Sequence, residues 1–337
     1  MKRITPEQIE GLGIGPAQCV EWVREAFLLK HECQLPAKIS VHPHGNDFFT
    51  TMPCLLPERY GRFGVKVVSR ILGRTPALQS DLMLFDSRSG ELLALIDCNW
   101  ITAMRTGAVA ALAIETFRTR RADTFAFVGL GSTAHATLSC LLATTECAQP
   151  HIRLLRYKDQ AERTIERFAG RTKAEFSIAG TMEELVAGAD AVVSCITDAS
   201  GLLVEDTSLF KPGVVVVPVH TRGFQNCDTL FEKVFADDTD HVKGFRYFSS
   251  FRSFHEFGEV LGGTCPGRET DDERILSYNI GLGLHDVCFA SRMYDLLDRA
   301  EAPHHAADET RGGGGEFVRH TTTYITGCRP EISGCAA

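Results

Sequence analysis

The spacing of apolar and polar residues changes along the chain. Residues 6–30 place Val20, Trp22, Val23 and Phe27 at helical intervals, which predicts a helix from Pro6 to about Lys30. Residues 37–101 instead hold strand-like runs: KISVH, FGVKVVSRIL, and the pair DLMLFD and ELLALID, which the turn SRSG joins as a hairpin. Strands without helices between them favour a mixed or antiparallel sheet.

From about residue 102 onward, helical and strand patterns alternate. An Ala-rich helix is predicted over 102–118. The apolar strands TFAFV, IRLLRY, AVVSCI and VVVVPVH follow it, and a helical stretch comes after each of the first two. This alternation predicts a parallel sheet covered by helices on both faces. The expected fold class is therefore α/β: a Rossmann doubly wound parallel sheet plus a second α+β domain with a mixed or antiparallel sheet.

These patterns predict two domains and a tail. Residues 119–280 form the Rossmann dinucleotide-binding domain. Residues 1–118 form the second domain, to which the last helical pattern, GLGLHDVCFASRMYDLLDRA, adds residues 281–302. Residues 303–337 have loop composition and no periodicity, so we expect a disordered tail there.

Composition narrows the class of protein. The net charge of −8 and the lack of a basic stripe argue against nucleic acid as the main partner. No run of about 18 apolar residues could span a membrane, and the N-terminus does not resemble a secretory signal. The 12 cysteines show no pairing or metal-ligand spacing, so we expect a cytoplasmic protein with mostly reduced thiols and no metal.

The run TFAFVGLGSTAHATLSCLL carries the strongest motif. Gly129, Gly131 and Ala134 form G-x-G-x-x-A between an apolar strand and a helix. The first glycine allows a tight turn, the second lets backbone approach a pyrophosphate, and the alanine lets helix and strand pack closely. Ser132 and Thr133 lie at the helix N-terminus, where N–H groups favour phosphate. The motif predicts dinucleotide binding; the alternative is a glycine turn that only packs a helix on a sheet.

The end of the next strand, HIRLLRYKD, bears on the choice of dinucleotide. NAD-dependent enzymes usually carry an acidic residue there to bind the ribose hydroxyls. This chain has Arg156, with Lys158 two residues on, and a guanidinium suits a 2′-phosphate. We therefore favour NADP(H) over NAD(H). The alternative is that both cations are solvated and Asp159 reaches the ribose.

Several segments resemble the ornithine cyclodeaminase/mu-crystallin family. They are FGVKVVS, the run LMLFDSRSGELLALID followed by ITAMRTGA, the loop VGLGSTA, PGRETDDERI and GLGLHDV, in the family's order over roughly residues 10–295. The resemblance implies a nicotinamide cofactor, an amino or imino acid substrate, and a homodimer formed through the non-Rossmann domain.

The resemblance also implies site residues. Lys66 matches the family's active-site lysine and Arg105 the arginine that binds the substrate carboxylate, while Lys38 lies where the family often has another basic residue. Thr106, next to Arg105, and Thr197, after the strand AVVSCI, are implied to lie near the cofactor. A lysine inside an apolar strand is costly to bury without purpose. For Arg105 a structural salt bridge remains an alternative.

The chain departs from the family's pattern after the strand VVVVPVH. Cyclodeaminases of this family carry an aspartate about where this chain has His220, with Arg222 two residues on. Losing that carboxylate argues against ornithine cyclisation. His220 could protonate an imine nitrogen, and Arg222 could bind a second anionic group. A hydrogen-bonded loop histidine and a solvated arginine are the alternative.

Three functions are compatible with these residues. The first is an NAD(P)-dependent imine reductase or amino acid dehydrogenase, in which Arg105 and Lys66 hold the carboxylate and Lys66 or His220 donates a proton. The second is an ornithine cyclodeaminase, a lyase that recycles NAD⁺ and gives proline and ammonia. The third is a non-catalytic dinucleotide-binding carrier or structural protein.

Overall fold

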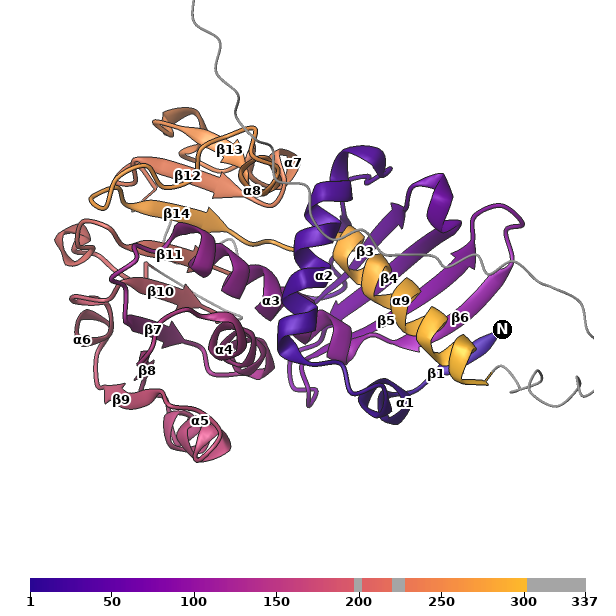
Figure 1. The fold of residues 1–337 in the computed structure, drawn as a ribbon, viewed down its shortest axis with the longest axis horizontal. Helices are drawn as coiled ribbons and strands as arrows, with labels where there is room; N and C mark the ends of the chain where they lie inside the picture. Colours follow the sequence, from indigo (N-terminus) through magenta and orange to yellow (C-terminus); the bar gives the residue numbers. More distant parts are fainter. Residues whose placement is uncertain (197–201, 220–227, 302–337) are drawn as a thin grey trace, which may run out of the picture. The chain divides into compact units, whose positions relative to one another are not determined.

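A six-stranded sheet forms the first part of the chain; the computed structural model describes residues 1–196, 202–219 and 228–301 (Figure 1). Its strand order is β1-β6-β5-β4-β3-β2, with β1 parallel to β6 and the other neighbours antiparallel. The mixed sheet and the β5–β6 hairpin predicted from the sequence are confirmed. The strands are β1 (Lys2–Ile4), β2 (Ile39–Val41), β3 (Phe48–Leu55), β4 (Arg62–Arg70), β5 (Leu78–Asp86) and β6 (Leu92–Asp97).

The single helix predicted from Pro6 to Lys30 is wrong: the segment forms α1 (Pro6–Gly11) and α2 (Pro16–Leu29). Gly13 between them has a φ of 62°, in the left-handed region that glycine adopts without strain. Pro16 opens α2 at a position where its missing N–H breaks no helical hydrogen bond. The apolar spacing continues across this break because both helices bury their apolar side in the same core.

The second sheet has eight strands, all parallel, in the order β13-β12-β14-β11-β10-β7-β8-β9. This confirms the predicted Rossmann-like sheet. Its strands are β7 (Thr124–Val128), β8 (His151–Leu155), β9 (Glu175–Ala179), β10 (Ala191–Ser194), β11 (Val215–Pro218), β12 (Lys233–Ala236), β13 (Phe254–Glu256) and β14 (Ile275–Tyr278).

Both faces of the parallel sheet are buried, which explains its near-continuous apolar strands. Alternate residues enter different cores: Phe125 and Phe127 of β7 lie in one apolar cluster, and Ala126 and Val128 in the other. The connecting helices are α4 (Ser132–Thr144), α5 (Gln160–Phe168), α6 (Met182–Val186), α7 (Thr239–Val242) and α8 (Phe257–Leu261).

Two long helices link the sheets. α3 (Asn99–Phe117) runs from the six-stranded to the eight-stranded sheet, and α9 (Gly283–Glu301) returns the chain to the six-stranded sheet (Figure 1). A Cβ on Gly64 of β4 would lie 2.7 Å from Val287 of α9, so the glycine lets this helix lie directly on the strand. One continuous apolar core therefore contains residues from both sheets.

The opposite face of the six-stranded sheet carries a row of apolar side chains that the described residues leave partly exposed. Pro53, Val65, Met83 and Leu95 are direct neighbours across β3, β4, β5 and β6. Met83 is 36% and Leu95 38% exposed. We call this surface the outer apolar face; Ile39, Val41 and Phe49, at the β2 edge, are exposed as well.

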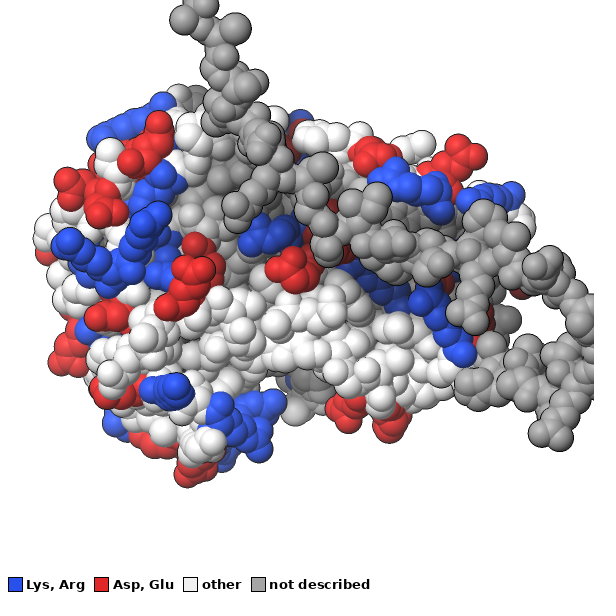
Figure 2. Space-filling view, viewed as in Figure 1, with Lys and Arg blue, Asp and Glu red and all other residues white. Residues whose placement is uncertain are grey.

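The charges on the surface agree with a protein that is not strongly basic. Figure 2 shows basic and acidic side chains interspersed on the face that it draws. Among the described residues, no helix is long and apolar enough to cross a membrane. Residues 1–300 form one compact unit. The division at residues 118 and 281 stays a prediction, and the predicted tail, 303–337, lies outside the described residues.

The closest packing between the helices is at Gly107, where α3 crosses α4. A Cβ at this position would lie 2.5 Å from the backbone carbon of Ala136 and 2.5 Å from the backbone nitrogen of Thr137. Both obstacles are main chain, which cannot rotate out of the way as a flexible side chain can. Only glycine lets the two helices approach to this separation.

We expect Gly107→Ala to lower the free energy of unfolding by about 2 kcal/mol, because overpacking forces the two helices apart. Urea denaturation measures the loss. Gly11→Ala is the matched control: Gly11 ends α1, and a Cβ there would meet nothing within 4 Å. Equal unfolding midpoints for the two variants would contradict the steric argument.

Candidate active site

The glycine loop lies at the carboxyl ends of two neighbouring parallel strands, β7 and β10. Gly129 has a φ of 80°, and a Cβ on it would lie 2.6 Å from the backbone nitrogen of Ile196. The residue must be glycine both for this conformation and for this contact. The first glycine of the motif therefore shapes the loop against the end of β10.

The second half of the loop is open. Gly131 precedes α4 in extended conformation; in the part of the chain that the structure describes, no side chain caps the helix and a Cβ on Gly131 would meet nothing within 4 Å. Ser132 is exposed and Thr133 partly exposed, while Ala134 is fully buried against the core. The uncapped N–H groups and the helix dipole fit a phosphate group at this position.

Arg156 and Lys158 lie just beyond β8, as the sequence predicts. The side chain of Arg156 is 54% exposed, and its Nη1 lies 2.6 Å from Oε1 of Glu162. Asp159, the alternative ribose ligand, is paired with Arg163 at 2.7 Å. Exposed pairs of this kind are weak and exchange readily with other partners, so both Arg156 and Asp159 could turn toward a ligand.

Lys66 and Arg105 converge on one buried carboxylate, that of Asp286. Lys66 points inward from β4 and is fully buried, with Nζ 2.7 Å from Oδ2 of Asp286. Arg105 of α3 donates from Nε to Oδ1 of the same group at 3.0 Å. Burial opposes ionisation of Asp286, but the charges of Arg105 and Lys66 outweigh it and hold the pKa of Asp286 below its usual value.

The contacts of these cations leave donors for a ligand. Among the described residues, Nζ of Lys66 makes no well-aligned hydrogen bond, and the bond from Arg105 uses only Nε. The pKa of Lys66 is lowered, first by burial and then by the charge of Arg105. A carboxylate placed between the Nη groups of Arg105 and Nζ of Lys66 would satisfy both.

Gly281 fixes the position of the Arg105 guanidinium. It has a φ of 93°, and a Cβ on this residue would collide with Nη1 of Arg105. Its N–H donates to Oδ2 of the buried Asp237. The segment between β14 and α9 therefore packs against the guanidinium of Arg105 on one side. On the other, its backbone is held by the carboxylate of Asp237.

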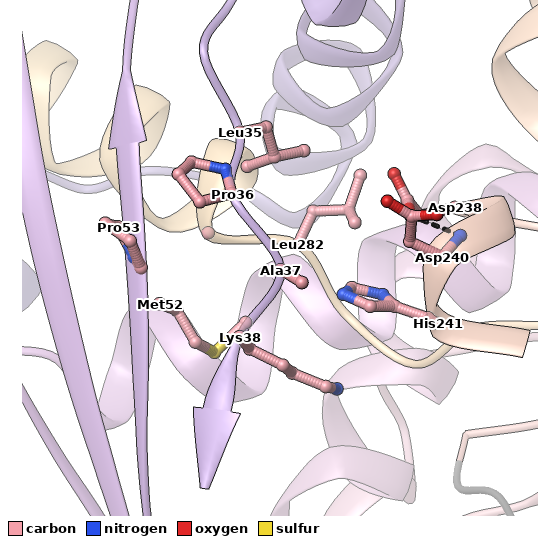
Figure 3. A pocket seen from close by; sticks show the side chains of 11 residues that line it. Leu35, Pro36, Ala37, Lys38, Met52, Pro53, Asp238, Asp240, His241 and Leu282 are labelled. Carbon is pink, nitrogen blue, oxygen red and sulfur yellow. Dashed lines mark hydrogen bonds between the residues drawn. The ribbon is translucent and has the colours of Figure 1, made fainter. Parts of the chain in front are cut away.

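Lys38 completes the cluster from the segment before β2. Its Nζ donates to the carbonyl of Ile280 at 3.2 Å. Burial, with Arg105 and Lys66 nearby, lowers the pKa of Lys38 to about 8, although Asp237 and Asp286 act in the opposite direction. Figure 3 shows the segment 35–38 beside a pocket, with Met52 and Pro53 of β3 on one side and His241 on the other.

The cluster carries one excess positive charge when its members hold their usual charges. Lys38, Lys66 and Arg105 stand against Asp237 and Asp286. Burial opposes ionisation of Asp237, but the neighbouring ring of His241, with Nδ1 3.8 Å from Oδ1, together with the Gly281 N–H and Lys38, keeps the pKa of Asp237 lowered. Three cations against two carboxylates favour a ligand with one negative charge.

His285 is a neutral member of this region. Burial, reinforced by the charge of Arg105, lowers the pKa of His285 to about 3. Its ring packs edge-on against Phe27, with centroids 4.5 Å apart. The sequence analysis did not single out Asp286, His285, Gly281 or Asp237. The first three lie in the run GLGLHDV, which contributed to the family resemblance, so the signal was present but had no assigned chemistry.

Of the remaining residues that the resemblance implies for the site, Thr106 is the one that the structure describes. Thr106 donates from Oγ1 to the carbonyl of Thr102 at 2.6 Å, within α3. Thr197, His220 and Arg222 lie outside the described residues. α3 nevertheless joins the two regions, because Arg105 and Gly107 lie two residues apart and Gly107 contacts α4 of the glycine loop.

Comparison with known proteins agrees with this architecture. The model of the ornithine cyclodeaminase/mu-crystallin family matches residues 7–301. The nodulation efficiency protein NfeD of Rhizobium meliloti is 27% identical over 276 residues, which cover 78% of this chain and 84% of that protein.

Two solved structures share the fold. One is Δ1-pyrroline-2-carboxylate reductase of Thermococcus litoralis in complex with NADH and L-proline: TM-score 0.79, 21% identity, 89% of this chain and 98% of that chain covered. The other is an archaeal alanine dehydrogenase dimer with bound NAD. Its TM-score is 0.76 at 21% identity, and the match covers 89% of this chain and 97% of that chain.

We expect Asp286→Asn to lower the free energy of unfolding by about 3–5 kcal/mol, because it leaves two buried cations without their carboxylate. Asp298→Asn is the control on the same helix. Asp298 pairs with Lys2 at 2.9 Å on the surface, where loss of an ion pair costs about 0–1 kcal/mol. Chemical denaturation of both variants measures the free energy of unfolding. Equal losses of this free energy in the two variants would refute the buried-pair argument.

Proposed function

Since this chain belongs to the ornithine cyclodeaminase/mu-crystallin family, we propose that it is an NADP(H)-dependent oxidoreductase acting on the C=N or CH–NH bond next to the carboxylate of an imino or amino acid. The observation that carries the proposal is the convergence of Lys66 and Arg105, both buried, on Asp286. A buried cluster with one excess positive charge suits the single α-carboxylate of such a substrate.

In this proposal each residue of the cluster has its own role. Arg105 binds the carboxylate through its Nη groups, and Lys38 and Lys66 bind the same group from the sheet side. Lys66 donates the proton to the imine nitrogen, since burial and Arg105 lower its pKa and make its proton easier to release. Asp286 keeps Lys66 and Arg105 in place. Most of the rate comes from this positioning and charge stabilisation.

The glycine loop supports cofactor binding. Gly129, Gly131 and the uncapped N-terminus of α4 would hold the pyrophosphate, with Ser132 and Thr133 beside it. When bound, the nicotinamide ring supplies or accepts the hydride. The open space at Gly131 and the close contact at Gly129 fit a dinucleotide better than they fit a loop that only packs a helix.

The test is oxidation of NADPH, followed at the reduced nicotinamide band, with a panel of cyclic imino acids and of 2-oxo acids plus amines. We expect turnover with at least one compound that bears a carboxylate next to C=N, and none with the matching amide, because Arg105 and Lys66 need the anion. If no compound of the panel is reduced and ornithine releases ammonia, the reductase proposal is overturned in favour of a cyclodeaminase. Tight cofactor binding without any turnover would favour a carrier.

The pH dependence should report Lys38. Below pH 8 its ammonium is charged and attracts the carboxylate; above pH 8 it is neutral, so the substrate KM should rise as the pH increases. Lys38→Arg keeps its charge at every accessible pH, because a guanidinium does not deprotonate there. We expect its KM to stay level up to pH 9.5. A wild-type KM that does not change between pH 7 and 9.5 would contradict this role.

We propose that Arg156 and Lys158 select NADP(H) over NAD(H). Arg156→Asp should lower the ratio of kcat/KM for NADPH to that for NADH, because a carboxylate repels the 2′-phosphate and accepts from a ribose hydroxyl. Arg163→Asp is the control, since Arg163 lies further along the chain in α5 and is equally basic. If the ratio moves no more for Arg156→Asp than for Arg163→Asp, the assignment fails.

We propose that the outer apolar face joins two copies of this chain in a homodimer. The row formed by Pro53, Val65, Met83 and Leu95 leaves apolar area in water that a second copy would cover. Met83→Glu should convert the dimer to a monomer in light scattering with size-exclusion chromatography. Leu28→Glu, at a 49% exposed position on α2, should leave the dimer intact. A monomeric wild type would exclude the proposal.

A further inference from the structure

Two cysteines lie on neighbouring segments of the chain, next to the pocket of Figure 3. Cys33 follows η1 (Lys30–Glu32), at the end of α2, and Cys54 lies on β3. Gln34 and Leu55 exchange two backbone hydrogen bonds of 3.0 Å each, an isolated antiparallel bridge. The residues just before them, Cys33 and Cys54, therefore share one face of the bridge as diagonal neighbours.

The two thiols differ in access. Cys33 is partly exposed and lines a surface cleft with Lys30 and His31. Cys54 is fully buried on the inner face of β3, opposite to the outer apolar face, so a second copy seated there would not cover the pair. One thiol can thus meet a small reagent from solvent, and the other is held behind it.

The two thiols also differ in ionisation. The neighbouring thiol of Cys54, helped by the charge of Arg59, lowers the pKa of Cys33 against burial and the charge of Glu32, and Sγ of Cys33 donates to the carbonyl of Leu29 at 3.3 Å. The same contact with Cys33, together with burial, raises the pKa of Cys54. Oxidation begins at a thiolate, so Cys33 is the residue that reacts first and Cys54 the residue that resolves it.

We propose that Cys33 and Cys54 form a reversible disulfide when the protein meets hydrogen peroxide. The Cys33 thiolate attacks one peroxide oxygen, the O–O bond breaks, and the products are a sulfenic acid and water once a proton is taken up. The Cys54 sulfur then attacks the Cys33 sulfur, the S–O bond breaks, and the second water leaves. In total two thiols lose two electrons and two protons, and one peroxide becomes two waters.

The disulfide would alter the pocket of Figure 3, which contains Lys38 of the proposed substrate site. The segment that begins at Cys33 continues through Leu35, Pro36 and Ala37, which line the pocket in Figure 3, to Lys38. Joining Cys33 to β3 shortens the separation of the two sulfurs and fixes the start of this segment. This consequence rests on the proposed function, because it is measured as a change in the KM for an imino acid. Formation of the disulfide does not depend on the proposed function.

The first experiment follows the thiols alone. The reduced full-length protein is treated with a few equivalents of hydrogen peroxide, alkylated, digested without reductant and examined by mass spectrometry. We expect a peptide linked through Cys33 and Cys54, formed before Cys147 is modified and reversed by dithiothreitol. Alkylation of both cysteines after treatment, or a link from either to a different cysteine, would overturn the proposal.

Two variants sharpen the result. Cys33→Ser should abolish the linked peptide, whereas Cys147→Ser should not, because Cys147 is a partly exposed thiol on the loop before β8, away from the pair. In the imine reduction assay, peroxide should raise the KM of the wild type by on the order of tenfold, because small displacements of positioning groups cost that much or more. Cys33→Ser should not respond.

These readouts separate the two proposals. A linked peptide in a protein that reduces no imine supports the disulfide and counts against the proposed function. A linked peptide in an active protein whose KM is unchanged overturns the effect on the pocket. An active protein that forms no Cys33–Cys54 link overturns the disulfide and leaves the reductase standing.

Discussion

The candidate site depends on a single buried carboxylate, that of Asp286, which pairs with two buried cations. Lys66 and Arg105 come from a strand and a helix that lie far apart in the sequence, and neither could be buried with its charge alone. Asp286 lies in the first turn of α9, where the positive end of the helix dipole also favours a negative charge. The ion triad therefore requires that α9, β4 and α3 all be docked.

Glycines at the contacts between elements make that docking possible. Gly64 lets α9 approach β4, Gly107 lets α3 approach α4, and Gly281 lets the chain before α9 lie against the guanidinium of Arg105. α3 takes part in two of these contacts, so the same rigid helix fixes Arg105 and packs against the helix of the glycine loop. Displacing α3 would disturb the substrate cluster and the cofactor loop together.

The segment between α2 and β2 forms one wall of the pocket in Figure 3. It carries Lys38, whose charge depends on pH near 8, and it begins at Cys33, which lies beside Cys54. Across the pocket lie Met52 and Pro53 of β3, the start of α7 and the start of α9. The segment between α2 and β2 holds its place through one isolated bridge, Gln34 to Leu55, and through the Lys38 bond to Ile280. Chemical changes here act directly on the pocket.

The sequence by itself determined the features that depend on neighbours in the chain. The alternation of apolar residues predicted both sheets, and G-x-G-x-x-A after an apolar strand predicted the loop at Gly129, because strand, turn and helix follow one another within a few residues. Lys66 was recognisable as a lone charge in an apolar strand. The break between α1 and α2 was missed, since apolar spacing reports which side is buried and not whether the backbone is continuous.

Tertiary structure alone decided what those charges meet. Nothing around Lys66 or Arg105 in the sequence names Asp286 as their shared partner, and nothing around Lys38 indicates that burial lowers its pKa to about 8. Electrostatic energies depend on distance in space and on exclusion of water. Both quantities exist only once α9 has folded back on the six-stranded sheet and α3 has crossed to the parallel one.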